Sequence, residues 1–328
     1  MTPPPAAPDF LASIGWGDAE ILPLAGDASF RRYFRVVDGE RSAVLMDAPP
    51  PHEDPKPFLD VAGWLAARGF AAPVIHGTDL SHGLVLLQDF GDVRMRETVD
   101  ADPAREAALY GAAIDLLVDL HKHEAGAFDP YDREVLHREV DLLVDWYCPA
   151  IGIEPDRRAW YAAWNAVFDA ALAGPKVTVL RDYHAENLML TGAKDSEGRD
   201  ALGLLDFQDA LAGHPAYDLV SLLQDARRDV PEATEAAMLA RYHAATHTDE
   251  AFDVAYHVLG AQRNAKIVGI FTRLWKRDGK PRYPTLCPRV WRYLNRDLEH
   301  PALAPVKAWF DATIPADKRG DPMAIAGQ

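Results

Sequence analysis

The chain has 328 residues, of which 48% are hydrophobic, so it is long enough to form one large domain or two modest ones. It carries 50 acidic and 34 basic residues, and the resulting net charge of −16 argues against nucleic acid as its main partner, because phosphate backbones attract a basic surface. No apolar run approaches the roughly 18 residues of a membrane-spanning helix, so we expect no membrane partner.

Two further features predict where the protein works. The N-terminal stretch, MTPPPAAPDF, lacks the basic and apolar segments of a secretory signal. Cys148 and Cys287 belong to no metal or redox motif and form no disulfide framework. We therefore expect free thiols in a reducing compartment and a cytoplasmic protein.

The first hundred residues predict a small sheet. Strands are expected at residues 20–25, 30–37, 42–46, 73–77 and 83–87, with Asp38-Gly39 as a hairpin turn and one helix at residues 57–68. A Gly-containing loop, Gly26-Asp27-Ala28-Ser29, joins the first two strands. Such a loop is typical of an ordinary hairpin, but also of a segment whose backbone N–H groups close over nucleotide phosphates. Because it precedes the polar motifs described below, we predict that Gly26, Asp27, Ala28 and Ser29 bind a nucleotide.

Residues on either side of this sheet extend the nucleotide hypothesis. Arg31 and Arg32 follow the loop and either bind phosphate or form a solvated charge pair, and we name Arg32 as the candidate ligand. The fifth strand runs into Gln88, Asp89 and Phe90, where a hinge would present its backbone to adenine, although an ordinary loop has the same pattern. The Gly91 break places the predicted domain boundary between residues 1–91 and 92–328.

The remainder of the chain is mainly helical in pattern. Helices are expected at residues 104–123, 133–147, 155–173, 249–277, 283–298 and 302–310. On the long helix 249–277, one stripe of polar residues recurs at 4-3-4 spacing and ends at Arg273. This stripe is either a solvated face or a source of cations for a substrate carboxylate. The candidate substrate-binding residues on and beside it are Arg263, Asn264, Lys266 and Arg273.

Residues 177–209 carry the strongest chemical pattern. A strand-like run, 177–180, leads to Asp182 and, five residues later, Asn187, and a second run, 202–205, leads to Asp206. In kinase-type phosphoryl transfer, the first Asp accepts the proton of the acceptor hydroxyl, while the Asn and the second Asp hold Mg²⁺. We predict these roles for Asp182, Asn187 and Asp206. Because Asp182 fills the proton-transfer role, we expect His184 to pack in the loop and Asp218 to cap or brace the backbone.

The same stretch resembles a known group of enzymes. Arg181-Asp182-x-His184-x-x-Asn187, Leu205-Asp206-Phe207-Gln208-Asp209 and Gly213-His214-Pro215-x-Tyr217-Asp218 are similar to motifs of the aminoglycoside phosphotransferase/choline kinase superfamily. The resemblance implies an α+β, bilobal protein-kinase-like fold, with a small antiparallel-sheet N-terminal lobe and a larger helical lobe. It also implies ATP and Mg²⁺ as cofactors.

Longer strings narrow this resemblance. Residues 26–35, 46–50 and 261–280 resemble the bacterial anomeric kinases of N-acetylmuramate and N-acetylglucosamine. Those enzymes phosphorylate the C1 hydroxyl of amino sugars during peptidoglycan recycling. The resemblance implies a small amino sugar and ATP as partners, and we expect a monomer.

One part of the kinase pattern is absent. The strand 42–46 has no Lys, and the helix 57–68 contains Asp60 but no Glu, so the usual Lys–Glu pair is missing or replaced. Candidate substitutes are Arg32, Arg35 and Lys56. A kinase of another small alcohol, such as an aminoglycoside, choline or homoserine, and a nucleotide-binding pseudokinase therefore stay open as alternatives.

Overall fold

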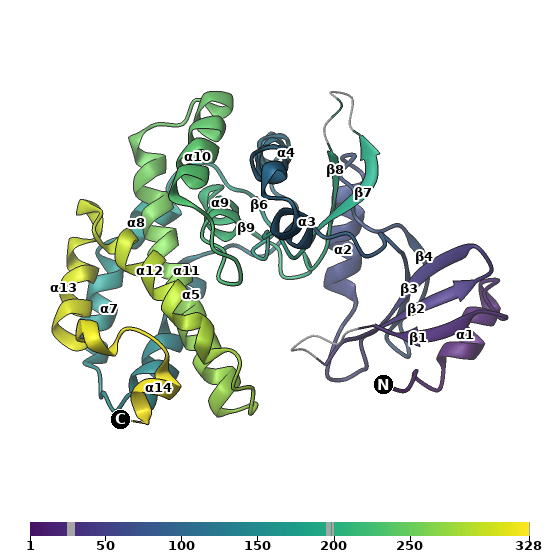
Figure 1. Ribbon diagram of the computed structural model, residues 1–328, viewed down its shortest axis with the longest axis horizontal. Coiled ribbons are helices and arrows are strands. Elements are labelled where there is room, and N and C mark those ends of the chain that lie inside the picture. Colours follow the sequence, from purple (N-terminus) through teal and green to yellow (C-terminus); the bar gives the residue numbers. More distant parts are fainter. Residues whose placement is uncertain (25–29, 195–197, 199, 328) are drawn as a thin grey trace. The chain divides into compact units, whose positions relative to one another are not determined.

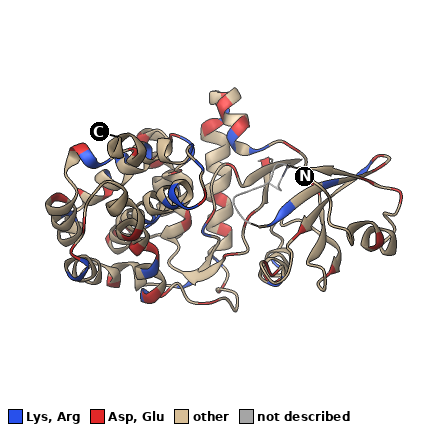
Figure 2. Cartoon of the chain, turned by 90° about the horizontal axis from the view of Figure 1, so that it is seen from below, with Lys and Arg blue, Asp and Glu red and all other residues tan. Residues whose placement is uncertain are grey.

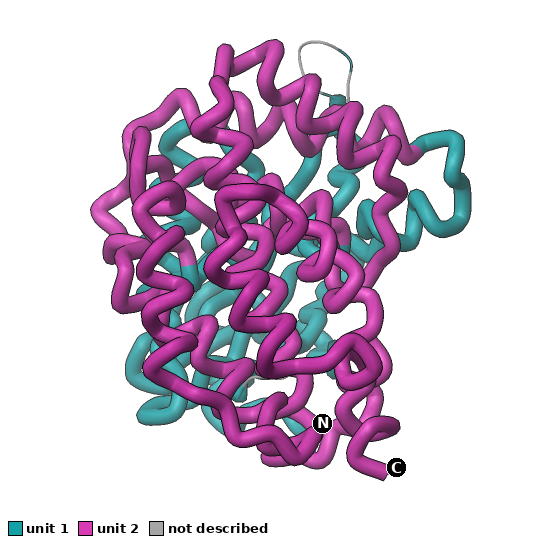
Figure 3. The backbone as a smooth tube through the Cα atoms, turned by 90° about the vertical axis from the view of Figure 1, so that its left-hand side faces the viewer, with its two compact units in different colours: residues 1–105, 186–209 teal, residues 106–185, 210–328 magenta. Residues whose placement is uncertain are grey.

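The computed structural model describes residues 1–24, 30–194, 198 and 200–327, and the chain forms two compact units (Figures 1 and 3). Unit 1 contains residues 1–105 and 186–209, and unit 2 contains residues 106–185 and 210–328. The predicted division into residues 1–91 and 92–328 does not coincide with these units. Residues 92–105 and 186–209 belong to unit 1, where the Leu190 N–H donates to the Val93 carbonyl at 2.8 Å and the Leu204 N–H donates to the Ala71 carbonyl at 2.8 Å.

Unit 1 is built on an antiparallel sheet with the strand order β1-β2-β3-β5-β4. Its strands are β1 (Glu20–Pro23), β2 (Arg32–Asp38), β3 (Arg41–Asp47), β4 (Ile75–Asp79) and β5 (Leu84–Gln88). The predicted hairpin between β2 and β3 is confirmed. Its two-residue loop is Gly39-Glu40, one residue later than predicted, because Asp38 pairs with Arg41. Gly39 adopts a φ of 61°, a left-handed conformation that glycine tolerates at no steric cost.

The two faces of this sheet differ. Phe34, Val36 and Leu45 lie on one face, in a buried cluster with α1 (Ala7–Ser13). Because strand side chains alternate, β3 presents Val44 and Met46 on the other face. Unit 1 also contains α2 (Lys56–Ala66), α3 (Met95–Ala101), the 3-10 turn η1 (Pro103–Arg105) and the paired strands β7 (Leu188–Lys194) and β8 (Asp200–Leu204).

Unit 2 is mainly helical, with one short two-stranded sheet formed by β6 (Val177–Val179) and β9 (Leu211–Gly213). Figure 2 shows Lys and Arg interspersed with Asp and Glu along its helices. The longer helices are α4 (Glu106–Leu120), α5 (Arg133–Leu142), α7 (Arg157–Asn165), α9 (Ala216–Leu223), α10 (Glu232–Thr246), α11 (Glu250–Lys276), α12 (Cys287–Leu298) and α13 (Ala304–Thr313). The shorter turns are η2 (Leu143–Tyr147, a π-helix), α6 (Cys148–Ala150), α8 (Phe168–Leu172), η3 (Pro284–Leu286), η4 (Pro301–Leu303), η5 (Ala316–Lys318) and α14 (Pro322–Ala326).

Helix α11 organises unit 2, because it packs against α5, α8, α9 and α12. Gly269 lies where α11 meets the end of α5, and a Cβ there would come within 2.3 Å of the Leu142 carbonyl carbon, so only glycine fits. The predicted long helix at 249–277 is confirmed, but the single helix predicted at 155–173 is wrong, since α7 and α8 are separate. Cys148 and Cys287 are buried free thiols, as expected. Among the described residues, no helix is both long and apolar enough to cross a membrane.

Candidate active site

Asp182 follows β6 in a turn that is fixed by the neighbouring helix α9. The preceding residue, Arg181, has a φ of 70°, a conformation that costs energy for any residue with a Cβ. The backbone N–H groups of Leu180 and Arg181 donate to the Asp218 carboxylate at 2.7 and 2.8 Å, and Ser221 Oγ donates to the Arg181 carbonyl at 3.0 Å. The strained turn is therefore held at both its N–H and C=O groups.

Asp218 has the bracing role that its position predicts. It lies in the first turn of α9 and is fully buried. Burial raises its pKa to about 7, although the hydrogen bonds from Leu180 and Arg181 act in the opposite direction. A buried carboxylate with two backbone donors is a structural support of the turn. Asp218 is fully buried, whereas Asp182 is only half-buried, so Asp182 is the carboxylate that a substrate can reach.

The electrostatic surroundings of Asp182 favour its ionised form. Burial alone would raise its pKa, but His184, Lys266, Arg263 and Arg181 together hold it below its usual value. The pKa of His184 is itself lowered to about 4, first by burial and then by Arg227, so this imidazole is neutral at pH 7. At neutral pH the charge that keeps Asp182 ionised therefore comes from the three cations.

His184 occupies a packing position, as expected. Its side chain is buried, and Arg227 Nη1 donates to its Nε2 at 3.2 Å. This contact ties the Asp182 turn to the segment after α9. Arg227 has no recognisable motif in the sequence, so sequence reasoning did not single it out.

Glu139 on α5 is a buried carboxylate that forms ion pairs with two cations near this turn, Arg181 and Lys266. It accepts hydrogen bonds from Lys266 Nζ at 2.8 Å and Gln262 Nε2 at 2.9 Å, and it also pairs with Arg181 and Tyr131. Despite burial, these cations lower the pKa of Glu139 to about 2. Sequence analysis missed Glu139, because a single Glu on an amphipathic helix is typical of a solvated surface.

The polar stripe on α11 is not a solvated face at its centre. Gln262 and Asn264 are fully buried, and Arg263 is 4% exposed. Arg263 Nη2 donates to Ser221 Oγ at 2.8 Å, so Arg263 reaches the group that holds the Arg181 carbonyl. Arg263 and Lys266 are therefore grouped with Asp182, as the substrate-site hypothesis requires.

The other two stripe candidates lie elsewhere. Asn264 Nδ2 donates to Gln224 Oε1 at 2.7 Å and to Asp297 Oδ2 at 3.2 Å, inside a buried polar network with α12. Arg273 is half-buried two turns further along α11, and burial and Arg277 lower its pKa. The structure does not bring Asn264 or Arg273 into the group around Asp182.

The predicted metal ligands lie together in unit 1. Asn187 precedes β7 and Asp206 follows β8, and these strands pair through Leu188 and Leu204. Asn187 Nδ2 lies 3.4 Å from Asp206 Oδ2, and Asp206 has a φ of 58°. The amide can equally present its oxygen, since its O and N atoms are assigned from hydrogen bonding. One carboxylate and one amide oxygen at this distance fit Mg²⁺ that completes its octahedron with phosphates and water.

The predicted hinge residues are Gln88, which ends β5, and Asp89 and Phe90, which follow it in unit 1. The Gln88 N–H donates to the Val74 carbonyl at 2.8 Å, so Gln88 still belongs to the sheet. Asp89 accepts hydrogen bonds from Arg35 Nε at 2.8 Å and the Gly91 N–H at 2.8 Å. The Phe90 ring packs where β8 has Gly203, at which a Cβ would lie 2.8 Å from the ring. The side chains of Asp89 and Phe90 thus contact other parts of unit 1. A contact with adenine at these residues would therefore be made by their backbone, as the hinge hypothesis expects.

The predicted phosphate loop, Gly26-Asp27-Ala28-Ser29, lies outside the described residues. Arg32, the predicted phosphate ligand, donates from Nε to Asp47 Oδ2 at 2.7 Å across the β2–β3 pair. Asp47 is 1% exposed, so this carboxylate compensates the charge of Arg32 within the sheet.

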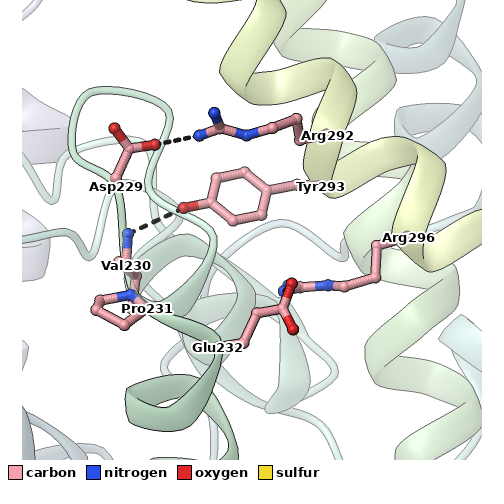
Figure 4. A pocket seen from close by; sticks show the side chains of 7 residues that line it. All are labelled: Asp229, Val230, Pro231, Glu232, Arg292, Tyr293 and Arg296. Carbon is pink, nitrogen blue, oxygen red and sulfur yellow. Dashed lines mark hydrogen bonds and ion pairs between the residues drawn. The ribbon is translucent and has the colours of Figure 1, made fainter.

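Two cavities lie in unit 2 away from these residues. One, of about 390 Å³, lies between the start of α10 and α12, where Asp229 pairs with Arg292 and Tyr293 accepts from the Val230 N–H (Figure 4). The other, of about 500 Å³, includes His121 and His214 among its lining residues. No predicted site residue lines either cavity, so neither is assigned to catalysis.

Comparisons with known proteins show the family of this chain. The chain matches the sequence model of the phosphotransferase enzyme family over residues 20–255. A protein of Caulobacter vibrioides named N-acetylmuramate/N-acetylglucosamine kinase is 39% identical, with 94% of this chain and 96% of the relative covered. A protein of Pseudomonas aeruginosa with the same name is 41% identical, with 88% and 87% covered.

Solved structures confirm the predicted α+β kinase-like fold. A choline/ethanolamine kinase family protein from Mesorhizobium loti gives a TM-score of 0.63 at 16% identity, covering 92% of this chain and 98% of that one. An aminoglycoside-3'-phosphotransferase of type VIII gives a TM-score of 0.52 at 17% identity, covering 76% and 97%. With the family match over most of its length, this chain belongs to the phosphotransferase enzyme family and is a kinase.

Proposed function

We propose that this kinase transfers the γ-phosphoryl group of ATP to the C1 hydroxyl of N-acetylmuramate and N-acetylglucosamine. The observation that carries the proposal is the state of Asp182, which lies in a braced turn and is kept ionised by Lys266, Arg263 and Arg181. Relatives that are 37–41% identical over most of the chain carry the name of this activity.

In the proposed reaction, Asp182 accepts the proton of the anomeric hydroxyl as the oxygen of this hydroxyl attacks the γ-phosphorus of ATP. Asp218 and Ser221 keep the turn in one conformation, so the carboxylate needs no rearrangement when the sugar binds. The bond to the β-phosphate oxygen breaks, and ADP leaves with that electron pair. Phosphoryl transfer of this kind depends on positioning and on charge stabilisation.

The nucleotide side of the proposal rests on unit 1. Asn187 and Asp206 would hold Mg²⁺, which neutralises charge on the phosphates. Gly26–Ser29 stay the predicted phosphate loop, and the backbone of Gln88, Asp89 and Phe90 stays the predicted adenine contact.

The acceptor side favours an anionic or neutral sugar. Arg181, Lys266 and Arg263 bring three positive charges to the neighbourhood of Asp182, and the acidic groups Asp182, Glu139 and Asp218 offset part of this charge. Cations beside Asp182 suit the carboxylate of N-acetylmuramate and disfavour polycationic aminoglycosides or choline. Within the proposed site, Lys266 and Arg263 are the sugar-side cations.

Phosphorus NMR of the product tests the proposal. The protein is incubated with Mg·ATP and, separately, N-acetylmuramate, N-acetylglucosamine, kanamycin, choline and homoserine. We expect a sugar-1-phosphate signal with the two amino sugars only. Turnover with kanamycin, choline or homoserine alone would replace the proposal by a kinase of that alcohol, and ATP binding without any product would indicate a pseudokinase.

A further inference from the structure

The Lys–Glu pair that kinases use for the α- and β-phosphates has no counterpart at its usual place in this chain. The β3 side chains on the sheet face opposite α1 are Ser42, Val44 and Met46, and none of them is a cation. Helix α2 contains no Glu along its length. The cation for these phosphates is therefore expected at another position in the chain.

The three substitutes expected from the sequence are all committed to other contacts. Arg32 pairs with Asp47 across the sheet, Arg35 with Asp89 and Asp92 after β5, and Lys56 with Asp60 on its own helix. The Lys56 side chain is 69% exposed, so its ion pair is weak and screened. The Arg35–Asp89 pair is shielded as well, but both acidic partners of Arg35 follow β5, and in the described contacts none of the three cations forms an ion pair with a residue of the segment between β3 and α2.

Arg31 forms an ion pair of this kind with Glu53. It lies between the predicted phosphate loop and β2, and its Nε donates to Glu53 Oε2 at 3.1 Å. The two side chains are only 13% and 16% exposed. Glu53 lies in the proline-rich segment between β3 and α2, three residues before α2 begins at Lys56, so it is close in sequence to the helix that carries the glutamate in other kinases.

Asp209 links this ion pair to the metal-binding motif. Burial would lower the pKa of the Arg31 guanidinium, but Tyr33, Glu53 and Asp209 raise it above its usual value. Asp209 lies three residues after Asp206 in the same motif, so Arg31 is near the end of unit 1 that carries the metal ligands. A shielded ion pair contributes little net stability, which leaves a positioned charge as its main consequence.

We propose that Arg31, oriented by Glu53, binds the α- and β-phosphates of the nucleotide and replaces the strand lysine and helix glutamate of other kinases. This inference rests on the proposed kinase function. A guanidinium carries five N–H donors in a planar fork, so the Nε contact with Glu53 is compatible with donation to phosphate oxygens. Glu53 acts through Arg31 and is a positioning residue.

Nucleotide affinities measured by calorimetry, without any sugar, test this assignment. For Arg31→Ala we expect the affinity for ADP to fall by about 10- to 100-fold, while the affinity for adenosine stays the same, because only the phosphate contact is removed. Glu53→Gln is expected to give a smaller loss of ADP affinity. The double variant should lose no more than Arg31→Ala alone, since Glu53 acts only through Arg31.

Arg68→Ala is the matched control, because Arg68 is an exposed arginine of unit 1 just after α2, and in the described contacts its side chain donates to the Trp64 carbonyl and lies over the Trp64 ring. Equal ADP affinity in Arg31→Ala and Arg68→Ala would overturn the inference, as would a parallel loss of adenosine affinity. Arg31→Lys, which keeps the charge but not the fork, should recover part of the ADP affinity, and no recovery with a correctly folded protein would also count against the assignment. Absence of sugar phosphorylation by the unaltered protein would instead refute the proposed function and leave the ADP-to-adenosine comparison valid.

Discussion

The carboxylate of Asp218 accepts a hydrogen bond at 2.8 Å from the backbone N–H of Arg181, the residue that immediately precedes Asp182. Arg181 is one of the described non-glycine residues with a positive φ, and Asp206 is another. Both strained residues thus occur in the two motifs that sequence analysis singled out. Backbone strain that is held by buried partners is often found where a side chain must be presented in one orientation.

Replacing Asp218 by Asn should slow catalysis, because Asp218 holds the turn that positions Asp182. The amide keeps one acceptor oxygen, but its NH₂ group faces the N–H of Leu180 or Arg181, and the turn loses a partner. We expect kcat to fall by about 100-fold, because a shift of about 1 Å at a catalytic group has this effect. Hydrogen exchange at the Arg181 amide should become faster.

The control for this change is Asp297→Asn, which alters another fully buried carboxylate of unit 2. Asp297 bonds Gln224, Asn264 and His257 rather than the Asp182 turn. It should lower stability while kcat stays close to that of the unaltered enzyme. A similar loss of kcat in both variants would show that the Asp218 effect is a general result of destabilisation.

Lys266 should set the pH at which activity is lost on the acid side. Lys266 is one of the charges that hold the pKa of Asp182 below its usual value, so Lys266→Met removes a favourable interaction with the ionised carboxylate and raises this pKa. We expect the acid limb of log kcat/KM against pH to move to higher pH. Arg273→Met, on the same helix but outside the group around Asp182, should leave this limb in place.

Glu139 should make stability depend on pH below about 4.5. Its pKa is about 2 in the folded protein and 4.5 as an ordinary side chain, so it contributes stability that is complete above pH 4.5 and is lost as the pH falls toward 2. Glu139→Gln should lower the free energy of unfolding at pH 7 by about 3–5 kcal/mol, since Lys266 and Arg181 lose their partner. The difference from the unaltered protein should shrink below pH 4.5.

Chemical denaturation at a series of pH values measures this effect. Glu134→Gln on the same helix changes an exposed carboxylate and should leave the unfolding curve nearly unchanged at every pH. A Glu139 effect that stays constant down to pH 2 would contradict the assigned ion pairs.

The metal site makes a separate prediction. Asp206→Asn removes the charged ligand, and we expect the Mg²⁺ concentration for half-maximal activity to rise by more than about 100-fold. Gln208 donates to Asp206 Oδ1 at 2.8 Å, so Gln208→Ala should have a smaller effect, of about 10-fold. Titration of activity with Mg²⁺ at fixed ATP distinguishes these variants, and an unchanged Mg²⁺ requirement in Asp206→Asn would reject its role as a ligand.

Sequence reasoning succeeded where the relevant residues lie close together in the chain. Asn187 and Asp206 lie at the ends of the paired strands β7 and β8, and their grouping was predicted from the order of polar residues along the chain, although β7 was not among the predicted strands. The long helix α11 was equally clear, because its hydrophobic positions repeat over 27 residues. Features of this kind can be predicted from the spacing of residues along the sequence.

Contacts between distant segments could not be predicted in the same way. Glu139 meets Lys266 across 127 residues, and Glu53 meets Arg31 across 22. Neither glutamate stands in a motif, and each looks like an ordinary surface charge until the fold buries it. The polar residues of α11 were also difficult to interpret from the sequence. Their spacing is usual for a solvated face, but the fold buries Gln262, Arg263 and Asn264.

The most direct test of the account is single-turnover phosphoryl transfer from ATP to N-acetylmuramate by Asp182→Asn, measured by rapid chemical quench. We expect the rate constant to fall by about 100- to 10,000-fold, because the proton acceptor is lost, while ATP affinity stays unchanged and the variant stays folded at the temperature of the assay. A variant that binds both substrates and still transfers phosphate within about tenfold of the original rate would contradict Asp182 as the base.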